Sequence, residues 1–375
     1  MNINTYAVEL RIDGTLIGDI RRIAENLTWA RRRTRIGVDE INFTVNDKLF
    51  AAWCADRGTD IANILRPLAL DCRIVRNGVA VMGGFLATMP TYTANSASGS
   101  LELRFDGYMN YLAGVYINPI GTLTGSADQM ISGQIQMADA RAAAAGKAFG
   151  FTEGTLNLST SIQQTFDNYI SVKDFIANRC DNVTGAGPFD VFFHADRTYD
   201  IIKDSKYGTV HDDYVIYYPT RINGVSATSI TADEVGTFAS SVIGIGSGEI
   251  SSNPDENTAI TTQQTNSDAV SQYGYYETIY QNSSIGQQSA LEMNTLAELN
   301  NTSNPLWQPQ LTLTGRQINP IPAGDRAIWI GDTIQLYNEA DTTNAMSGAF
   351  RVNELVVNIS ATGAETITPV LERVL

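Results

Sequence analysis

The chain carries few of the side chains on which acid–base and nucleophilic enzymes depend. Only two of its 375 residues are histidines, His194 and His211. His194 stands at the end of a predicted strand. The segment His211-Asp212-Asp213 predicts a turn, which we interpret as a solvated loop. No Gly-x-Ser-x-Gly sequence marks the sharp turn that presents a nucleophilic serine. A Ser-His-Asp triad is therefore not indicated.

Carboxylates and cysteines give no clearer sign of chemistry. Two carboxylates at the right spatial separation can hydrolyse a glycan, but with 40 acidic residues chance pairs are abundant. Cys54, Cys72 and Cys180 form no Cys-x-x-Cys pair, so neither a disulfide framework nor a zinc site is predicted. We predict no catalytic, cofactor-binding or metal site, and a glycosidase stays an alternative.

A glycine-rich stretch, "GIGSGE" at 244–249, could suggest a phosphate-binding loop. It lacks the Lys-Ser/Thr pair of such loops, and the following "ISSNPDENTA" does not open a helix. Glycine inside a strand pattern more often marks a bulge or a close approach of backbones. We therefore predict a strand bulge or a loop at a crowded axis.

The strongest charge block is the run Arg31, Arg32, Arg33, Thr34, Arg35 in a chain of net charge −15. As a nucleic-acid site it lacks interleaved aromatic residues beyond Trp29. As a face that forms salt bridges to an acidic neighbour it needs nothing more. A solvated strand edge is the third interpretation. We predict that Arg31, Arg32, Arg33 and Arg35 contact a partner protein.

Composition limits the class of protein. With 43% hydrophobic and 17% charged residues, the chain is globular and long enough for two to four domains. Its acidity disfavours nucleic-acid binding. No run of 18 apolar residues predicts a membrane helix, and the first residues do not resemble a signal peptide. We expect synthesis in a cytoplasm.

Alternating apolar residues predict a small antiparallel β-barrel over residues 1–112. Val8, Leu10 and Ile12 share one face of a strand, which ends at Asp13-Gly14, a strong hairpin signal. Asn77-Gly78 marks a second hairpin. The stretch between the strands, residues 47–67, predicts one or two short helices.

The rest of the chain divides by composition. Residues 113–213 predict an α+β domain: residues 125–151 are small and alanine-rich, Val172, Phe175, Ile176 and Arg179 have helical spacing, and Ala195-Asp196-Arg197 marks a turn between two strands. Strands at 214–250 and 306–375 predict a second barrel, and residues 251–305 an inserted polar loop with one helix. The fold class is thus mainly β with an α+β middle domain, two related small antiparallel β-barrels and inserted domains.

The two predicted barrels share an order of parts. Residues 71–108 and 332–374 each run from Asp through strands and a small Ser/Ala/Gly turn to a final strand. The letters hardly match, so both a duplication and chance likeness of hairpins stay open.

The terminal hairpin predicts a buried strand. We expect core positions at Phe350, Val352, Leu355, Val357 and Ile359. Their parity changes at Asn353-Glu354, which predicts a β-bulge there.

The domain order and several segments resemble the baseplate hub, or tail-associated lysin N-terminal, family of tailed bacteriophages. The segments are "YVIYYPTRINGVSATSI", "SSVIGIGSG", "SQYGYYETI", "LAELN" followed by "LTLTG", "IGDTIQL" and "FRVNELVVNIS". Together they span most of the chain, but no single motif is diagnostic.

The resemblance implies a structural virion protein at the tail tip, made in the host bacterial cytoplasm. It implies a homotrimer whose six barrels adapt the sixfold distal tail protein ring to a threefold tip and line the DNA exit channel. Further expected partners are the tape measure protein and tail fibre or receptor-binding proteins. Because the sequence ends at Leu375, directly after the second barrel, we expect any lytic activity in another protein. The alternatives are a tail-tip cell-wall hydrolase and a carbohydrate-binding β module.

Overall fold

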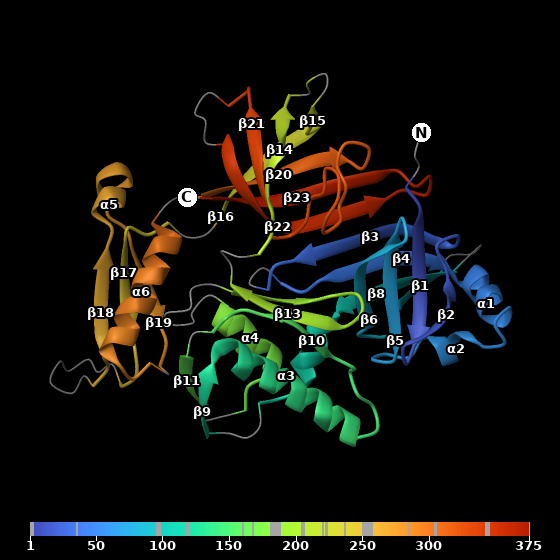
Figure 1. The fold of residues 1–375 in the computed structure, drawn as a ribbon, viewed down its shortest axis with the longest axis horizontal. Coiled ribbons are helices and arrows are strands. Elements are labelled where there is room, and N and C mark those ends of the chain that lie inside the picture. The colour runs from blue at the N-terminus through green and yellow to red at the C-terminus, as the bar shows by residue number, and fades with distance from the viewer. Residues whose placement is uncertain are drawn as a thin grey trace. The chain divides into compact units, whose positions relative to one another are not determined.

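The computed structural model divides the chain into two compact units (Figure 1). Unit 1 comprises Met1–Asp181, Pro188–Thr231 and Pro309–Leu375, and unit 2 comprises Asn182–Gly187 and Ala232–Gln308. The structure describes residues 4–34, 37–94, 99–117, 121–159, 161–166, 169–180, 189–203, 207–219, 221, 224–235, 238–249, 258–283, 285–303, 306–341 and 346–374.

Unit 1 begins with a group of strands that we call the first strand set. Its members are β1 (Tyr6–Ile12), β2 (Thr15–Asp19), β3 (Ala24–Arg32), β4 (Glu40–Asn46), β5 (Leu70–Arg76), β6 (Val79–Leu86) and β8 (Gly99–Gly107). They are hydrogen-bonded in the order β2-β1-β5-β6-β8-β4-β3, and the short β7 (Thr91–Ala94) pairs with β8. The predicted antiparallel β-structure of residues 1–112 is confirmed.

The predicted turns and helices of this region are confirmed. Asp13-Gly14 joins β1 to β2 and Asn77-Gly78 joins β5 to β6, all four residues with positive φ, as a tight hairpin turn requires. Helix α1 (Asp47–Ala55) begins after Asn46, whose side chain accepts hydrogen bonds from the backbone N–H groups of Lys48 and Leu49. Helix α2 (Ile61–Ile64) and the 3-10 helix η1 (Tyr108–Gly114) complete the region.

The middle region is α+β, as predicted. Strands β9 (Gly121–Ser126) and β11 (Ser161–Phe166) form one ladder, and β10 (Thr152–Leu156), β13 (Thr198–Lys203) and β12 (Phe189–Phe193) form another. Helices α3 (Ala127–Ala144) and α4 (Val172–Cys180) accompany them. The buried Val172, Phe175 and Ile176 confirm the helical spacing of α4.

A second strand set follows. It consists of β14 (Val210–Tyr218), β15 (Val225–Ser226), β16 (Ser229–Val235), β20 (Leu306–Thr314), β21 (Thr333–Asn338), β22 (Gly348–Ile359) and β23 (Glu365–Arg373). The set belongs to unit 1 except for the end of β16 and the start of β20. Their order in the sheet is β15-β14-β21-β22-β23-β20-β16.

The two strand sets have the same order, both along the chain and across the sheet. Strands β1, β2, β3, β4, β5, β6 and β8 correspond in turn to β14, β15, β16, β20, β21, β22 and β23. One direction differs: β1 is antiparallel to β2 and β5, whereas β14 is parallel to β15 and β21. Related strand orders are what a duplication predicts.

The terminal hairpin matches its prediction. The five expected core residues of β22, from Phe350 to Ile359, are at most 2% exposed. The register between β22 and β23 shifts between Val352 and Glu354, so the predicted bulge at Asn353-Glu354 is confirmed.

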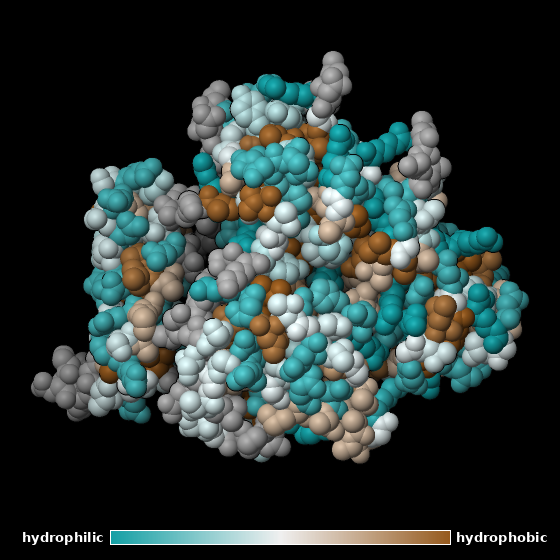
Figure 2. Space-filling model, in the orientation of Figure 1, coloured by the Kyte–Doolittle hydropathy of each residue, from teal (hydrophilic) through white to brown (hydrophobic). Residues whose placement is uncertain are grey.

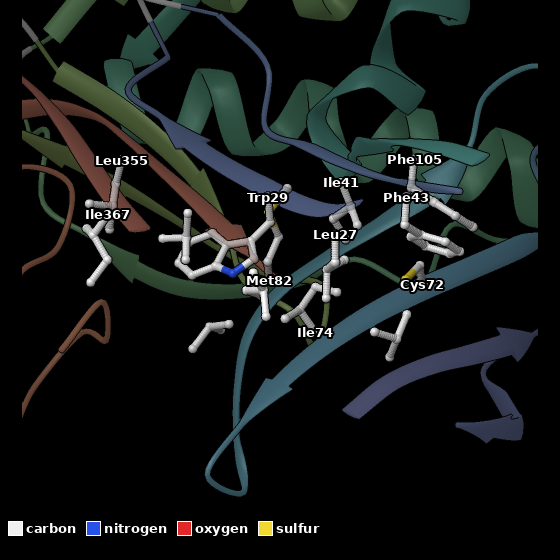
Figure 3. Close-up of a cluster of buried hydrophobic side chains, with 14 of the residues drawn as sticks. Leu27, Trp29, Ile41, Phe43, Cys72, Ile74, Met82, Phe105, Leu355 and Ile367 are labelled. Carbon is white, nitrogen blue, oxygen red and sulfur yellow. The ribbon is translucent and has the colours of Figure 1, made fainter. Parts of the chain in front are cut away.

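One continuous core joins the strand sets, because β22 also pairs with β3. Figure 3 shows Trp29 of β3 between Leu355 and Ile367 of the second set and Ile41 and Phe43 of the first. Trp29 is fully buried.

Unit 2 is a small α/β unit of its own. Strands β18 (Thr261–Thr265), β17 (Ser241–Ile245) and β19 (Glu277–Gln281) form its sheet in that order, with helices α5 (Ser267–Tyr273) and α6 (Gln288–Thr302). This division differs from the predicted one, which placed residues 241–250 in the second barrel and gave 251–305 a loop with one helix. Alternate residues of β18 and β19 are exposed and mostly polar, so their hydrophobic periodicity is weak and the two strands escape notice.

The described helices include none that is both long and apolar enough to cross a membrane. On the face shown in Figure 2, hydrophobic residues form small separate patches within a largely hydrophilic surface.

Candidate functional site

The feature that connects the two strand sets is the pairing of β3 with β22, which we call the β3–β22 joint. Six residue pairs make it, running antiparallel from Glu354 opposite Arg32 to Ile359 opposite Leu27. On its inner face Trp29 lies opposite Val357, and both are fully buried. On its outer face Thr28 Oγ1 donates a 2.7 Å hydrogen bond to Asn358 Oδ1. The joint therefore combines backbone pairing, a buried apolar row and a polar outer row.

Arg31 extends from the joint into the protein. Its side chain is 1% exposed. Nη1 lies 3.0 Å from Asp39 Oδ2 and donates a 2.9 Å hydrogen bond to the carbonyl of Phe193. Burial raises the pKa of the Asp39 carboxyl group, and the charge of Arg31 offsets part of that rise. Arg31 thus ties β3 to the middle region.

Arg33 forms the most completely buried ion pair of this group. Its Nε and Nη2 donate to Asp190 Oδ2 at 2.8 and 2.5 Å, and the two side chains are 1% and 0% exposed. The other oxygen, Asp190 Oδ1, accepts a 3.0 Å hydrogen bond from the backbone N–H of Thr34. Both carboxylate oxygens are therefore satisfied, which a buried charge requires.

Arg32 points to the other side of the strand and is half-buried, at 23% exposure. Its Nε lies 2.7 Å from Glu354 Oε1 across the joint, and Nη1 donates to the carbonyl of Val38 at 2.7 Å. Arg32 therefore fixes the register of β3 against β22.

The arginine block does not lie where the sequence placed it. Arg31 and Arg33 are buried with partners inside the chain, so they cannot face a neighbouring protein, and this part of the prediction is corrected. Arg32 keeps an exposed fraction, and Arg35 lies outside the described residues. The reason is long-range topology: the carboxylate that neutralises Arg33 is 157 residues away in the sequence, so local sequence shows the positive charges without their partner.

A second buried ion pair connects the strand sets and was not predicted. Arg76, at the end of β5, binds Glu365, at the start of β23, through Nε–Oε1 at 2.7 Å and Nη2–Oε2 at 2.9 Å, both side chains being 1% exposed. Asn4 Nδ2 donates to the same Glu365 Oε2 at 2.8 Å. Nothing in the local sequence marks this pair, because its members are 289 residues apart.

The histidines are engaged with carboxylates. His194 Nε2 lies 2.7 Å from Asp200 Oδ2. Burial opposes ionisation of Asp200, but its hydrogen bonds to His194 and to the backbone N–H of Thr155 outweigh burial and lower its pKa. His211 is buried in β14, not in a solvated turn, with Nε2 3.0 Å from Asp332 Oδ2. The turn expected at His211 is therefore corrected to a strand.

The glycine-rich stretch serves close packing in unit 2. An added Cβ at Gly244 would overlap Thr295 of α6, and one at Gly246 would meet Ile260 at 2.5 Å. The crowding expected at these glycines is therefore present. The expected bulge is not, because Ser241–Ile245 of β17 pairs with β18 and β19 without a shift of register.

Two surface clefts show what chemistry the described residues could offer. A cleft of about 1240 Å³ is lined by one carboxylate, Glu365, which Arg76 neutralises. A second, of about 630 Å³, is also lined by one carboxylate, Asp13, which pairs with Lys147. Within the described ranges no three His, Cys, Asp or Glu side chains gather as metal ligands would.

Comparisons with known proteins identify the fold. No family model matches the sequence, and no curated protein does. Among solved structures, the chain is similar to the 43 kDa tail protein of prophage MuSo2 from Shewanella oneidensis (11% identity, TM-score 0.62, 98% of both chains covered). It is similar to a tail protein from Neisseria meningitidis MC58 (12%, 0.62, 98% of this chain and 96% of that one). It is also similar to prophage tail protein gp18 from Listeria monocytogenes EGD-e (10%, 0.57, 97% and 94%). The chain therefore has the fold of phage tail proteins, which confirms the suspected resemblance at the level of the fold.

Proposed function

We propose that this chain is a structural protein of a bacteriophage tail and that three copies form the hub at the tail tip. The observation that carries the proposal is the likeness of nearly the whole chain to phage tail proteins over nearly their whole length. The likeness includes the inserted regions as well as the strand sets, so it concerns an entire architecture and not one common β-domain.

The repeated strand order supports the threefold stoichiometry. A chain with two strand sets of equal order can present two similar surfaces, so three chains offer six. Six similar surfaces match a sixfold ring, such as the distal tail protein ring, and three chains match a threefold tip. The tape measure protein and tail fibre or receptor-binding proteins are further proposed partners. Arg32, which is 23% exposed, is the described residue of the arginine block that can contact one of them.

The net charge of −15 agrees with a channel through which DNA passes. Phosphate is repelled by a wall of like charge, so an acidic hub would not retain the DNA that leaves through it.

The stoichiometry can be measured on the purified protein. Mass photometry and light scattering should give a species of three times 40.7 kDa, and negative-stain images should show a ring. A monodisperse monomer at micromolar concentration would contradict the hub.

The two alternatives predict different activities. Incubation with bacterial cell walls separates a structural hub from a hydrolase, since the hub should release neither sugar nor peptide. A glycan array separates the hub from a carbohydrate-binding module. Wall lysis by protein free of contaminating lysin would overturn the structural assignment.

A further inference from the structure

The strand correspondence assigns specific partners to two free strand edges. We propose that the outer edge of β7 pairs with the outer edge of β16 from a second copy of this chain, repeating between subunits the β3–β22 joint made within each subunit. The inference rests on the proposed hub and names the surface by which its subunits meet.

The first step is that β7 takes the place of half of β22. Strand β22 pairs with β23 along its length, and on its other side it pairs first with β21 and then, from Glu354 on, with β3. In the first set, β6 pairs with β5 and β8, and β7 then continues along β8 after a two-residue shift of register. Strand β7 therefore corresponds to the half of β22 that makes the joint.

The alternating burial of β8 and β23 indicates which residues correspond, and the buried pairs Leu86–Phe105 and Val352–Leu371 agree with it. Leu101, Leu103 and Phe105 of β8 are buried at alternate positions, as are Ile367, Pro369 and Leu371 of β23. When these two rows are superposed, Ser100 corresponds to Thr366. Thr93, which pairs with Ser100, then corresponds to Asn358, which pairs with Thr366.

The second step is that β16 takes the place of β3. Val45 of β4 pairs with Leu101, and Leu313 of β20 pairs with Ile367, so Thr44 corresponds to Thr312.

The side chains around these two threonines repeat as well. Asn26 Nδ2 donates to Thr44 Oγ1 at 3.2 Å, and Ser229 Oγ donates to Thr312 Oγ1 at 2.8 Å. The buried Ala24 and Ala227 stand two residues before Asn26 and Ser229, so Asn26 corresponds to Ser229. With the irregularity that β3 has between Glu25 and Thr28 repeated in β16, Thr28 corresponds to Thr231.

The third step is that both edges lack a strand partner among the described residues. Strand β7 pairs with β8 alone and β16 with β20 alone, whereas β3 has both β4 and β22. All four residues of β7 are exposed, including Tyr92 at 57%. The sequence Thr-Tyr-Thr-Ala has high β-propensity and carries no charge or proline, the usual protections of an edge strand. An unprotected edge of this kind is suited to strand addition.

The correspondence predicts the register between subunits. Thr93 of one copy lies opposite Thr231 of the next, as Asn358 lies opposite Thr28 within the chain. Two exposed threonines can exchange a cross-strand hydrogen bond there. Tyr92 then lies opposite the small Ala232, so its exposed ring gains cover.

This contact joins different surfaces of the two copies. Head-to-tail contacts of unlike surfaces close into a ring when the rotation allows. Three in-chain joints and three such contacts would alternate around a ring of six strand sets.

The test is a disulfide across the predicted contact, made in the full chain as Thr93→Cys with Thr231→Cys. Cα atoms of opposed antiparallel residues are about 4.5–5.5 Å apart, within disulfide range. Mild oxidation should give covalent dimers and trimers that dithiothreitol reverses, and no larger species. Mixing the two single variants should give covalent dimers, whereas neither single variant should cross-link by itself.

A matched control checks chemistry and folding. Thr28→Cys with Asn358→Cys places the same pair in the joint within one chain, so it should close a disulfide without changing the mass on a denaturing gel. If that control closes and the Thr93/Thr231 variant gives no covalent oligomer, the proposed contact is wrong. If the wild-type protein is then a trimer by mass photometry, the proposed hub is retained. If it is a monomer, both the hub and the β7–β16 contact are contradicted. A ladder beyond the trimer, or dimers from one single variant, would also overturn the head-to-tail ring.

Discussion

Removing Asp190 should be among the most destabilising single substitutions in unit 1. Asp190→Ala deletes the carboxylate that accepts two hydrogen bonds from the Arg33 guanidinium group and an acceptor for the backbone N–H of Thr34. Glu372, whose Oε2 lies 4.0 Å from Arg33 Nη1, is more distant and 30% exposed. Both charged side chains are essentially unexposed. Removing one partner of a buried ion pair costs about 3–5 kcal/mol. We expect the free energy of unfolding of the variant to fall by that amount in urea titrations followed by tryptophan fluorescence, at equal protein concentration.

Two controls separate the lost charge pair from lost packing. Arg33→Met with Asp190→Leu removes both charges and leaves chiefly the Thr34 N–H without its acceptor, so it should cost only about 1–3 kcal/mol. Lys147→Met breaks an exposed pair with Asp13, whose side chains are 53% and 57% exposed, and should cost less than about 1 kcal/mol. If Asp190→Ala costs no more than Lys147→Met, the buried Arg33–Asp190 ion pair does not stabilise the attachment of β3 to the middle region as we infer.

Two other features give independent predictions. An added Cβ at Gly315 would overlap the Glu365 carboxylate, so Gly315→Ala should break the Arg76 pair and destabilise the chain by about 3 kcal/mol; unchanged urea unfolding would contradict this. Burial raises the pKa of Tyr108 to about 12, and it raises the pKa of Tyr6, Tyr111, Tyr207 and Tyr214 above the usual range. A raised folded-state pKa stabilises the neutral form, so this stability is complete below about pH 10 and falls as the pH rises through 12, by about 2.7 kcal/mol for Tyr108. Absorbance titration at 295 nm should show these tyrosines ionising only as the fold is lost, and early ionisation with an intact fold would refute it.

Local sequence predicted what local physics controls. The Asp-Gly and Asn-Gly turns require positive φ. Asp, Asn and Gly tolerate that conformation, so these dipeptides predict the turns from the local sequence. The parity change between Val352 and Leu355 located a bulge, because a side chain can reach the core from one face of a strand only. A helix likewise buries one face, so apolar residues at spacings of three and four predicted α4.

Long-range electrostatics could not be predicted in this way. Four arginines within five residues of an acidic chain suggest a surface, since arginine is rarely buried without a partner. The partners exist, but Asp190 and Glu354 reach Arg33 and Arg32 only through the tertiary fold. The unit 2 strands Thr261–Thr265 and Glu277–Gln281 were missed for another reason. Their exposed residues are mostly polar and their half-buried residues are not a row of apolar side chains, so no apolar alternation marks them.

The differences between the strand sets are placed where they do not affect the proposed contact. The reversed strand β14 lies with β15 at the end of the strand order opposite to β16. Strands β17, β18 and β19 and helices α5 and α6 of unit 2 lie along the chain between β16 and β20, where the first set has only the short connection from Arg33 to Asp39. Connections at the ends of strands tolerate insertions because closing a longer loop costs little. The strands of the joint and of the proposed contact have corresponding neighbours in the two sets. Strand β3 pairs with β4 as β16 pairs with β20, and β22 pairs with β23 as β7 pairs with β8. A chain built in this way can use one kind of strand pairing twice, once to close its own core and once to meet the next subunit.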